Sequence, residues 1–388
     1  MDRAITQRAP SVLGGTRAKV VPTVERSESS MHLPAGRDLV RVLALSLVVA
    51  LSASVAACGS DSPTTSSSSL VSIGAGIEGP SGLHATTYAT GLDTVAGLAF
   101  DAEGKLWAST ASYQDDGKDA VYLIAKAGAT PRKVISGLHS AIGLLWFKGE
   151  LYVASKERVH AYSGFDGTRF ATKRTVVALP SGVGEVNGLA VSTAGRISLG
   201  ISSPCDHCDP TSPYSAAVVS FLPDGSGLRV DASGIRAAVG LTYDATTGDL
   251  FATMNQRDDL GTKTPGDSLG VIETGQDWKF PDCYGQKGTA CTDTPDPVAE
   301  LDDHAAVSGV TIDEGGIAGA GRVALVAEYA KGKVLKVVLK GTGAQTTGTA
   351  TTFLSGFTNP VPISTGPDGS IYVGDWGSGS IVRVAQAS

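Results

Sequence analysis

An arginine followed by an acidic loop is the most chemically suggestive part of this 388-residue sequence. Arg236 stands before a predicted strand pair at residues 240–255, and the loop at residues 256–267 follows that pair. A guanidinium at a strand entrance can stabilise negative charge that develops on a bound group. An oxygen-rich loop suits a hard cation such as Ca²⁺, although a solvated loop would have the same composition. The candidate metal-site residues are Gln256, Arg257, Asp258, Asp259 and Asp267.

Four cysteines form two further candidate sites. Cys205 and Cys208 stand in Cys-Asp-His-Cys, and Cys283 and Cys291 flank a short segment after the acidic loop. In an exported domain an even number predicts two disulfides, with three connectivities open. The first pair would also suit zinc or redox chemistry, but the sequence lacks a fuller ligand set for the one and a βαβ context for the other. We therefore favour structural disulfides.

A repeated pair of short strands must position these residues. The inner pairs start at Gly97, Gly143, Gly188, Gly240, Gly309 and Pro362. Each unit also has an outer pair, for example in residues 120–138 and 216–235. Four strands in about 50 residues are typical of one propeller blade. The sequence therefore predicts an all-β, six-bladed β-propeller over residues 84–388.

The two ends of the repeat predict how the ring closes. The last unit ends near residue 384 after three strands, while residues 84–92 have the form of an outermost strand. Pairing these two strands would leave no long unpaired edge.

Six polar residues fall in the connections that lead into the inner strands, on the face where propellers usually bind ligands. They are Asp93, His139, Glu185, Arg236, His304 and Asn359. Any one of them could be a loop residue bonded to nearby backbone. Together, two histidines, an arginine and two carboxylates around one channel indicate a site.

The first 83 residues predict export and membrane attachment. Residues 1–57 comprise an extension, with Met31 a candidate start, and a lipoprotein signal peptide that ends in Val-Ala-Ala before Cys58. Small residues before a cysteine favour lipidation of Cys58 over ordinary cleavage. Residues 58–83 are rich in Ser, Thr and Gly and predict a linker. We expect a protein held by its lipid on the outer side of a bacterial membrane. The net charge of −7 argues against a nucleic-acid partner.

Three segments carry a resemblance to a known family. They are GIRAAVGLTYDATTGDLFATMNQRDDL, NGLAVSTAGRISLGISSPCDHCDP and GPDGSIYVGDWGSGSIVRV. These resemble the glucose/sorbosone dehydrogenases over residues 84–388. The resemblance implies a six-bladed propeller that oxidises sugars with pyrroloquinoline quinone (PQQ) and Ca²⁺, and an electron acceptor in the cell envelope. It puts the arginine beside the quinone at Arg236 and the calcium-binding carbonyls near Gln256 and Arg257. His139, His304 and Asn359 are the other candidate cofactor-binding residues.

Two positions depart from the family pattern. Glu185 stands where the resemblance places a catalytic histidine, so a carboxylate would have to accept the sugar's proton. The entrance to the last blade reads Thr-Asn-Pro-Val-Pro at residues 358–362, without the basic residues that would hold the quinone's carboxylates.

Two alternatives to a dehydrogenase remain open from the sequence. One is a non-catalytic lipoprotein that binds a carbohydrate or another envelope protein. The other is a metal-dependent lactonase, which would need ligands to converge from Glu185, Asn187, Asp93 or Asp375.

Overall fold

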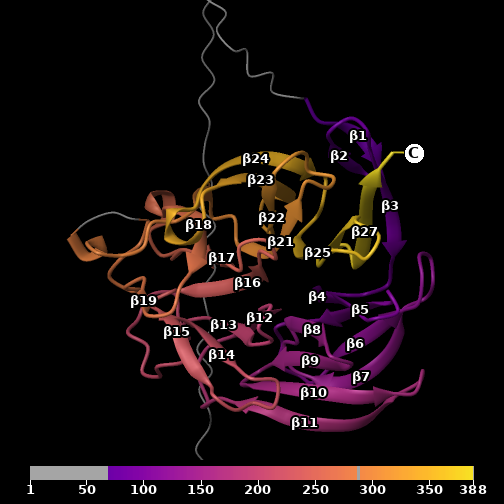
Figure 1. The fold of residues 1–388 in the computed structure, drawn as a ribbon, viewed down its shortest axis with the longest axis horizontal. Helices are drawn as coiled ribbons and strands as arrows, with labels where there is room; N and C mark the ends of the chain where they lie inside the picture. The colour runs from indigo at the N-terminus through magenta and orange to yellow at the C-terminus, as the bar shows by residue number, and fades with distance from the viewer. Residues whose placement is uncertain (1–68, 286–288, 388) are drawn as a thin grey trace, which may run out of the picture. The chain divides into compact units, whose positions relative to one another are not determined.

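Six sheets surround one axis in the computed structural model, which describes residues 69–285 and 289–387 (Figure 1). Blade 1 contains β4 (Val95–Phe100), β5 (Leu106–Thr110), β6 (Asp119–Ile124) and β7 (Arg132–Leu138). Blade 2 contains β8 (Gly143–Phe147), β9 (Glu150–Ser155), β10 (Arg158–Phe165) and β11 (Phe170–Ala178). Blade 3 contains β12 (Val186–Val191), β13 (Ile197–Ile201), β14 (Ala217–Phe221) and β15 (Arg229–Ser233).

The second half of the ring has the same plan. Blade 4 contains β16 (Ala237–Tyr243), β17 (Leu250–Asn255), β18 (Gly266–Ile272) and β20 (Ala299–Asp303). Blade 5 contains β21 (Val307–Glu314), β22 (Arg322–Glu328), β23 (Lys333–Lys340) and β24 (Thr347–Ser355). Blade 6 contains β25 (Pro360–Thr365), β26 (Ile371–Asp375), β27 (Ser380–Gln386) and, outermost, β3 (Leu83–Ala89). The predicted six-bladed, all-β propeller is confirmed.

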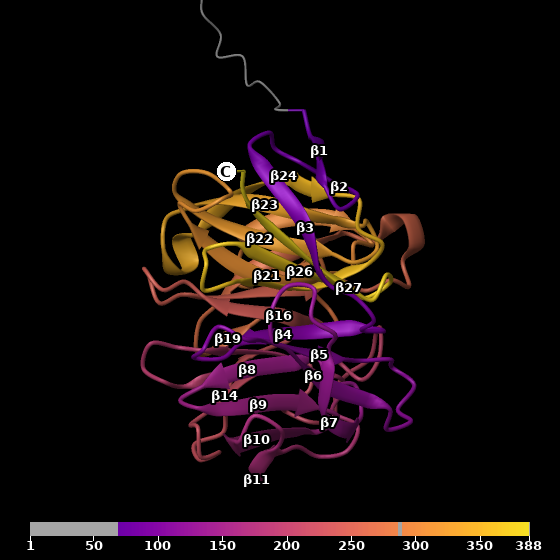
Figure 2. The same cartoon turned by 90° about the vertical axis from the view of Figure 1, so that its right-hand side faces the viewer.

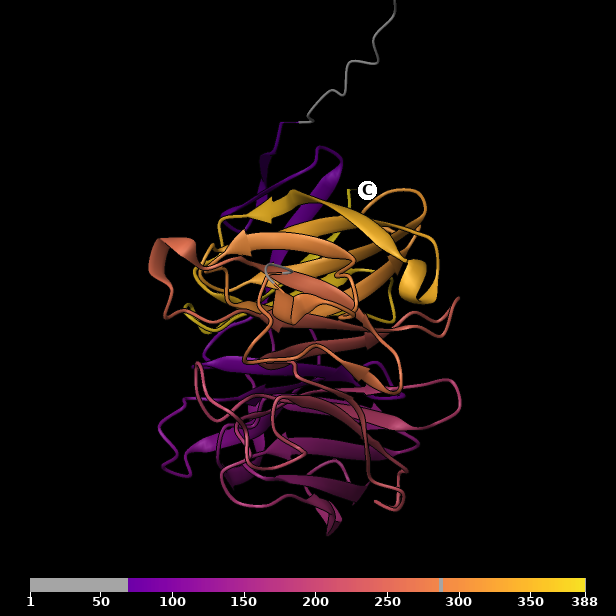
Figure 3. The same cartoon turned by 90° about the vertical axis from the view of Figure 1, so that its left-hand side faces the viewer.

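The first strand of each blade contacts the first strand of the next, and β25 returns to β4, so that the ring is closed. Within each blade neighbouring strands are antiparallel, and the loops therefore gather on two opposite faces, as the side views show (Figures 2 and 3). The connections into the inner strands share one face with the turns between the second and third strands. We call this the entrance face, and the other the hairpin face.

Glycine opens five of the six inner pairs because the inner strands pack directly on the backbone of the next blade. A Cβ on Gly143 would lie 2.3 Å from the carbonyl oxygen of Asn187, and one on Gly240 would lie 2.2 Å from that of Ser308. Real Cβ atoms do not come this close, so a side chain would force the blades apart. The sequence repeat therefore reports a packing constraint at the axis.

Six aliphatic side chains, one from each inner strand, fill the central channel of the propeller. They are Leu98, Leu144, Leu189, Leu241, Val310 and Ile363, each between 5% and 9% exposed. They line a cavity of only about 80 Å³. A site on the entrance face therefore has an apolar base.

The predicted closure of the ring is confirmed. Strand β3 pairs antiparallel with β27, with Thr86 opposite Arg383, and completes the last blade as its fourth strand (Figure 2). The strand begins at Leu83, one residue before the boundary predicted from the sequence.

Residues 71–79, which we assigned to the linker, instead form a β-hairpin. Its strands are β1 (Val71–Gly74) and β2 (Ile77–Gly79), and Glu78 on β2 pairs with Ser355 on β24. Ile73 and Ile77 are 6% and 2% exposed in the core. These two isoleucines pack the hairpin against the core. The small residues around them made the segment resemble a flexible linker in the sequence. The predicted linker boundary at residue 83 is therefore wrong, because ordered strand begins at Val71.

The chain between β18 and β20 leaves blade 4 and binds to the outer strand of blade 3. Strand β19 (Gln276–Asp277) pairs in parallel with β15, and the N–H of Trp278 donates to the carbonyl of Ser233 at 2.9 Å. The described helices are single 3₁₀ turns, η1 (Gly261–Lys263), η2 (Thr289–Cys291) and η3 (Gly343–Gln345). Over residues 69–285 and 289–387 no helix is long and apolar enough to cross a membrane. The predicted signal segment and Cys58 lie outside the described residues.

Candidate functional site

A cavity of about 600 Å³ opens on the entrance face, over blades 1 to 4. Its size lies within the range of ordinary ligand pockets. Glu185 and Arg236 line it from the connections before β12 and β16, as the sequence predicted. Lys156 and Glu157, between β9 and β10, and Tyr113, between β5 and β6, also line it, and these three were missed.

Glu185 presents an unpaired carboxylate to this cavity. Its backbone is fixed, because its carbonyl accepts the N–H of Ser202 at 2.9 Å just before β12 begins. Among the described residues its carboxylate has no hydrogen-bond or ion-pair partner. The side chain faces solvent inside a concave wall, and partial desolvation there raises its pKa, with the charge of Arg236 acting in the opposite direction. A carboxylate with these properties can accept a proton.

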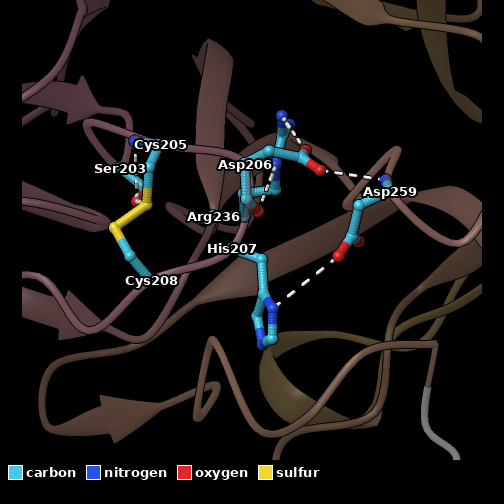
Figure 4. Close-up of a disulfide and its surroundings, with 7 residues drawn as sticks. All are labelled: Ser203, Cys205, Asp206, His207, Cys208, Arg236 and Asp259. Atoms are coloured by element: carbon cyan, nitrogen blue, oxygen red, sulfur yellow. Dashed lines mark hydrogen bonds and ion pairs between the residues drawn. A yellow bond between two sulfur atoms is a disulfide. The ribbon is translucent and has the colours of Figure 1, made fainter.

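Of the residues that the structure describes, Asp206 is the one that holds the Arg236 side chain (Figure 4). Its Nη2 lies 2.6 Å from the Asp206 carboxylate, and its Nε donates to the Asp206 carbonyl at 3.3 Å. The arginine side chain is only 20% exposed. The pair fixes the guanidinium at the cavity wall and neutralises part of its charge.

Asp206 also holds the acidic loop in place. Its carboxylate accepts the backbone N–H of Asp258 at 3.0 Å and that of Asp259 at 2.9 Å. A single carboxylate therefore joins the entrance of β16 to the loop between β17 and β18. Sequence reasoning missed this role because the partners are 30 to 53 residues away.

Both predicted disulfides are present, and their connectivity is local. Cys205 pairs with Cys208 and Cys283 with Cys291, with Cα–Cα distances of 6.0 and 4.8 Å. The zinc alternative at the first pair is therefore wrong for the oxidised protein. The short loop between Cys205 and Cys208 carries Asp206 at its tip (Figure 4).

The carboxylates of the acidic loop are already engaged by protein donors. Asp267 is 3% exposed and accepts the N–H groups of Gln256 at 2.8 Å and Val307 at 3.2 Å; burial raises its pKa to about 6. Asp259 receives a bidentate contact from Arg257 at 2.5 and 2.6 Å. The Arg257 guanidinium also lies 4.8 Å from the centre of the Tyr284 ring.

Asp258 completes this pattern through His304. The Nδ1 of His304 lies 2.9 Å from the Asp258 carboxylate, and its Nε2 lies 2.8 Å from the carbonyl oxygen of Gly261. The Gly261 carbonyl and the Asp258 carboxylate raise the pKa of His304. In the described part of the chain no three His, Cys, Asp or Glu side chains are grouped for a metal ion. The carboxylates of the loop do not fit a Ca²⁺ site, because protein donors already occupy their oxygens. The predicted Ca²⁺ site would therefore have to use the backbone carbonyls of Gln256 and Arg257.

The remaining predicted residues stabilise loops. His139 Nδ1 lies 2.7 Å from Asp115, which also binds Lys156 at the cavity wall. Asn359 donates from its side chain to the Tyr329 carbonyl at 3.1 Å and from its backbone to Asp375 at 2.8 Å.

The proposed lactonase ligands do not converge. Asn187 is 1% exposed and donates to Ser202 Oγ at 2.9 Å and to the Ala238 carbonyl at 3.0 Å. Asp375 is 4% exposed and accepts backbone N–H groups, while Asp93 is exposed. Of these four residues only Glu185 lines the cavity.

Comparison with known proteins shows the fold. No family model and no curated protein matches the chain. The PQQ-bound aldose sugar dehydrogenase of Streptomyces coelicolor matches with a TM-score of 0.60 and 21% identity, over 79% of this chain and 99% of that one. The PQQ domain of pyranose dehydrogenase from Coprinopsis cinerea matches with 0.62 and 16%, over 80% and 97%. The calcium structure of a Trichoderma reesei carbohydrate-active enzyme of family AA12 matches with 0.63 and 17%, over 80% and 96%.

Proposed function

We propose that this chain is a quinone-dependent sugar dehydrogenase. The observation that carries the proposal is the unpaired Glu185 carboxylate, with its raised pKa, sharing one cavity of about 600 Å³ with Arg236. The likeness of the fold to PQQ-bound sugar dehydrogenases supports it. An exposed carboxylate alone would not, because most are solvated surface groups.

The donor set of the cavity fits an anionic cofactor. Arg236 and Lys156 both line the cavity, and each is a cation that can face a carboxylate or a quinone oxygen. Bound here, PQQ would supply the acceptor for a hydride from a sugar carbon that carries a hydroxyl group. Glu185 would take the proton of that hydroxyl, and Arg236 would stabilise negative charge developing beside it.

Reconstitution tests this proposal directly. The purified protein should bind PQQ, and dye-linked oxidation of aldoses should follow. Glu185→Gln should reduce kcat by at least about a hundredfold while quinone affinity is retained, because only the proton acceptor is lost. Arg236→Ala should weaken both binding and turnover, because its charge acts on both.

Glu157 provides the matched control. It lines the same cavity, but its carboxylate accepts the N–H of Gly182 at 3.0 Å, and this bond, with a second from Ser181, lowers its pKa. Glu157→Gln removes one charge from the wall without removing an available base. Failure of the wild-type protein to bind PQQ, with or without Ca²⁺, would reject the dehydrogenase; equal loss in both Gln variants would reject Glu185 as the base.

A non-catalytic carbohydrate-binding protein is the second candidate. It is favoured by the pairing of both cavity cations, Arg236 with Asp206 and Lys156 with Asp115, which leaves less charge for an anionic cofactor. Sugar binding in the same cavity without quinone binding would support it.

We also propose that the protein acts at the outer side of a bacterial membrane, attached through lipidated Cys58. The apolar segment before the cysteine and the small residues that adjoin it support this location. An envelope electron acceptor would then reoxidise the quinone.

A further inference from the structure

Charge is distributed very unevenly along this acidic chain. Residues 126–174 contain nine Lys and Arg against three Asp and Glu, a net charge of +6, whereas the whole chain has a net charge of −7. Residues 256–303 contain four Lys and Arg against eleven Asp and Glu, a net charge of −7. The excess positive charge therefore lies in blades 1 and 2, and the excess negative charge lies in blade 4 and its loops.

The structure gathers much of this positive charge on one surface. Six exposed cations of blades 1 and 2 have no ion-pair partner among the described residues. They are Lys126, Arg132, Lys133, Lys148, Arg158 and Lys173. Arg158 begins β10 at the entrance-face end of the blade, next to Glu157, and we call the other five residues the basic surface. Exposed cations that are not neutralised by nearby carboxylates produce a local positive potential, even on a protein of opposite net charge.

Aromatic rings support several of these cations. Lys133 Nζ lies 5.5 Å from the centre of the Tyr122 ring, and Lys173 Nζ lies 5.6 Å from that of Tyr162. The Arg132 guanidinium lies 5.8 Å from the centre of the Phe165 ring. These contacts orient the long side chains over rigid strands of blades 1 and 2.

Hydrogen bonds join the two blades at this surface. Arg132 on β7 donates to the carbonyls of Gly167 and Thr168, in the turn between β10 and β11, at 2.8 and 3.0 Å. Within blade 2, His160 on β10 lies close to other cations. Burial lowers its pKa, and the nearby cations Lys173 and Arg158 lower it further. The basic surface is therefore continuous across the two blades.

The basic surface is directed away from the cavity. Lys126 lies in the turn between β6 and β7 and Lys148 in the turn between β8 and β9, and both turns are on the hairpin face. Arg132 and Lys133 begin β7 at the same end of blade 1. The cavity is formed by loops of the opposite, entrance face. A flat anionic partner on the hairpin face would leave the cavity open to a substrate.

We propose that the basic surface docks on an anionic phospholipid membrane and orients the cavity away from it. The length of the linker favours this partner. Twelve residues separate Cys58 from the first described strand, which begins at Val71, and an extended chain of that length reaches about 40 Å. A lipid at Cys58 would therefore keep the domain close to the bilayer, where weak electrostatic attraction becomes effective. The inference does not depend on quinone binding.

The test uses the chain from Gly59 onward, without lipid, and vesicles of phosphatidylcholine with or without phosphatidylglycerol. The protein should sediment with the anionic vesicles, not with the neutral ones, and high salt should release it. Reversing Lys126 and Lys133 to Glu should weaken binding by more than twentyfold, since each cation near such a surface contributes about fivefold.

The matched control is Lys263→Glu with Lys340→Glu, which reverses exposed lysines of blades 4 and 5. This control should retain vesicle binding, and thermal melting of both variants should show that the fold is intact. Equal loss in both variants would mean that net charge alone is responsible, and the docking surface would be rejected. Binding to soluble polyglutamate without binding to anionic vesicles would assign the surface to an acidic protein and overturn the membrane proposal.

Discussion

Glu185 differs from its neighbours on the entrance face because its carboxylate has no partner in the described chain and remains available to a ligand. Most polar side chains there bond to loops, as His139, His304 and Asn359 do. Glu185 has no such partner in the described chain, and Arg236 lies close enough to influence its pKa without forming an ion pair with it. The Glu185 carboxylate can therefore accept a proton here, because burial raises its pKa above its ordinary value.

The first prediction at this scale concerns pH. A base acts when it is ionised, so kcat/KM should fall as pH decreases through the raised pKa of Glu185. Because Arg236 lowers that pKa, Arg236→Met should raise it further and move the acid limb of the profile to higher pH. Arg236→Lys keeps the charge and should leave the limb near its original position. An acid limb that stays in place in the Met variant would show that another group titrates.

At the scale of elements, the site depends on one short loop. The Cys205–Cys208 disulfide presents Asp206, which bonds to Arg236 and to the N–H groups of Asp258 and Asp259. A disulfide that closes so short a loop contributes little through chain entropy. Its value here is in the placement of one carboxylate between two blades.

This arrangement predicts a local effect of Asp206. Asp206→Ala should leave two backbone N–H groups without their acceptor and speed hydrogen exchange in residues 256–267, with little change elsewhere. Mass spectrometry of peptides from that loop measures the effect. Asp209→Asn is the control, because Asp209 has an exposed carboxylate without a partner among the described residues. Unchanged exchange in the Asp206 variant would show that the loop is held by other contacts.

The same scale shows what the sequence could and could not predict. The inner strands could be predicted from glycines such as Gly143 and Gly240, because no side chain fits where two blades meet. The same packing recurs in successive blades, so the glycine recurs in the sequence. The β1–β2 hairpin was missed because only two buried residues, Ile73 and Ile77, pack it against the core. Two apolar residues are too few to produce a recognisable alternation of apolar and polar positions in the sequence. Arg236 was found from its place before a strand, whereas its partner Asp206 depends on a contact across 30 residues that no local pattern encodes.

At the scale of the whole molecule, charge and cavity are placed on different parts of the ring. The basic surface belongs to the hairpin face of blades 1 and 2, and the cavity opens on the entrance face. If a lipid at Cys58 attaches the protein to a membrane, the domain could otherwise present any side to it. Positive charge opposite the cavity favours the orientation in which substrate can enter, and it would do so without any contact near the site.

The last prediction concerns the attachment itself. If Cys58 carries a lipid, a metabolically incorporated fatty-acid label should be found on the peptide that begins at Cys58, and Cys58→Ala should lose the label. The protein should then move from the membrane fraction to the soluble fraction after a high-salt wash, because such a wash also releases electrostatic contacts. At low salt, part of the unlipidated protein should stay on anionic membranes through the basic surface. Label retained by the Ala variant would place the lipid elsewhere, and unchanged membrane association at high salt would require an apolar anchor other than Cys58.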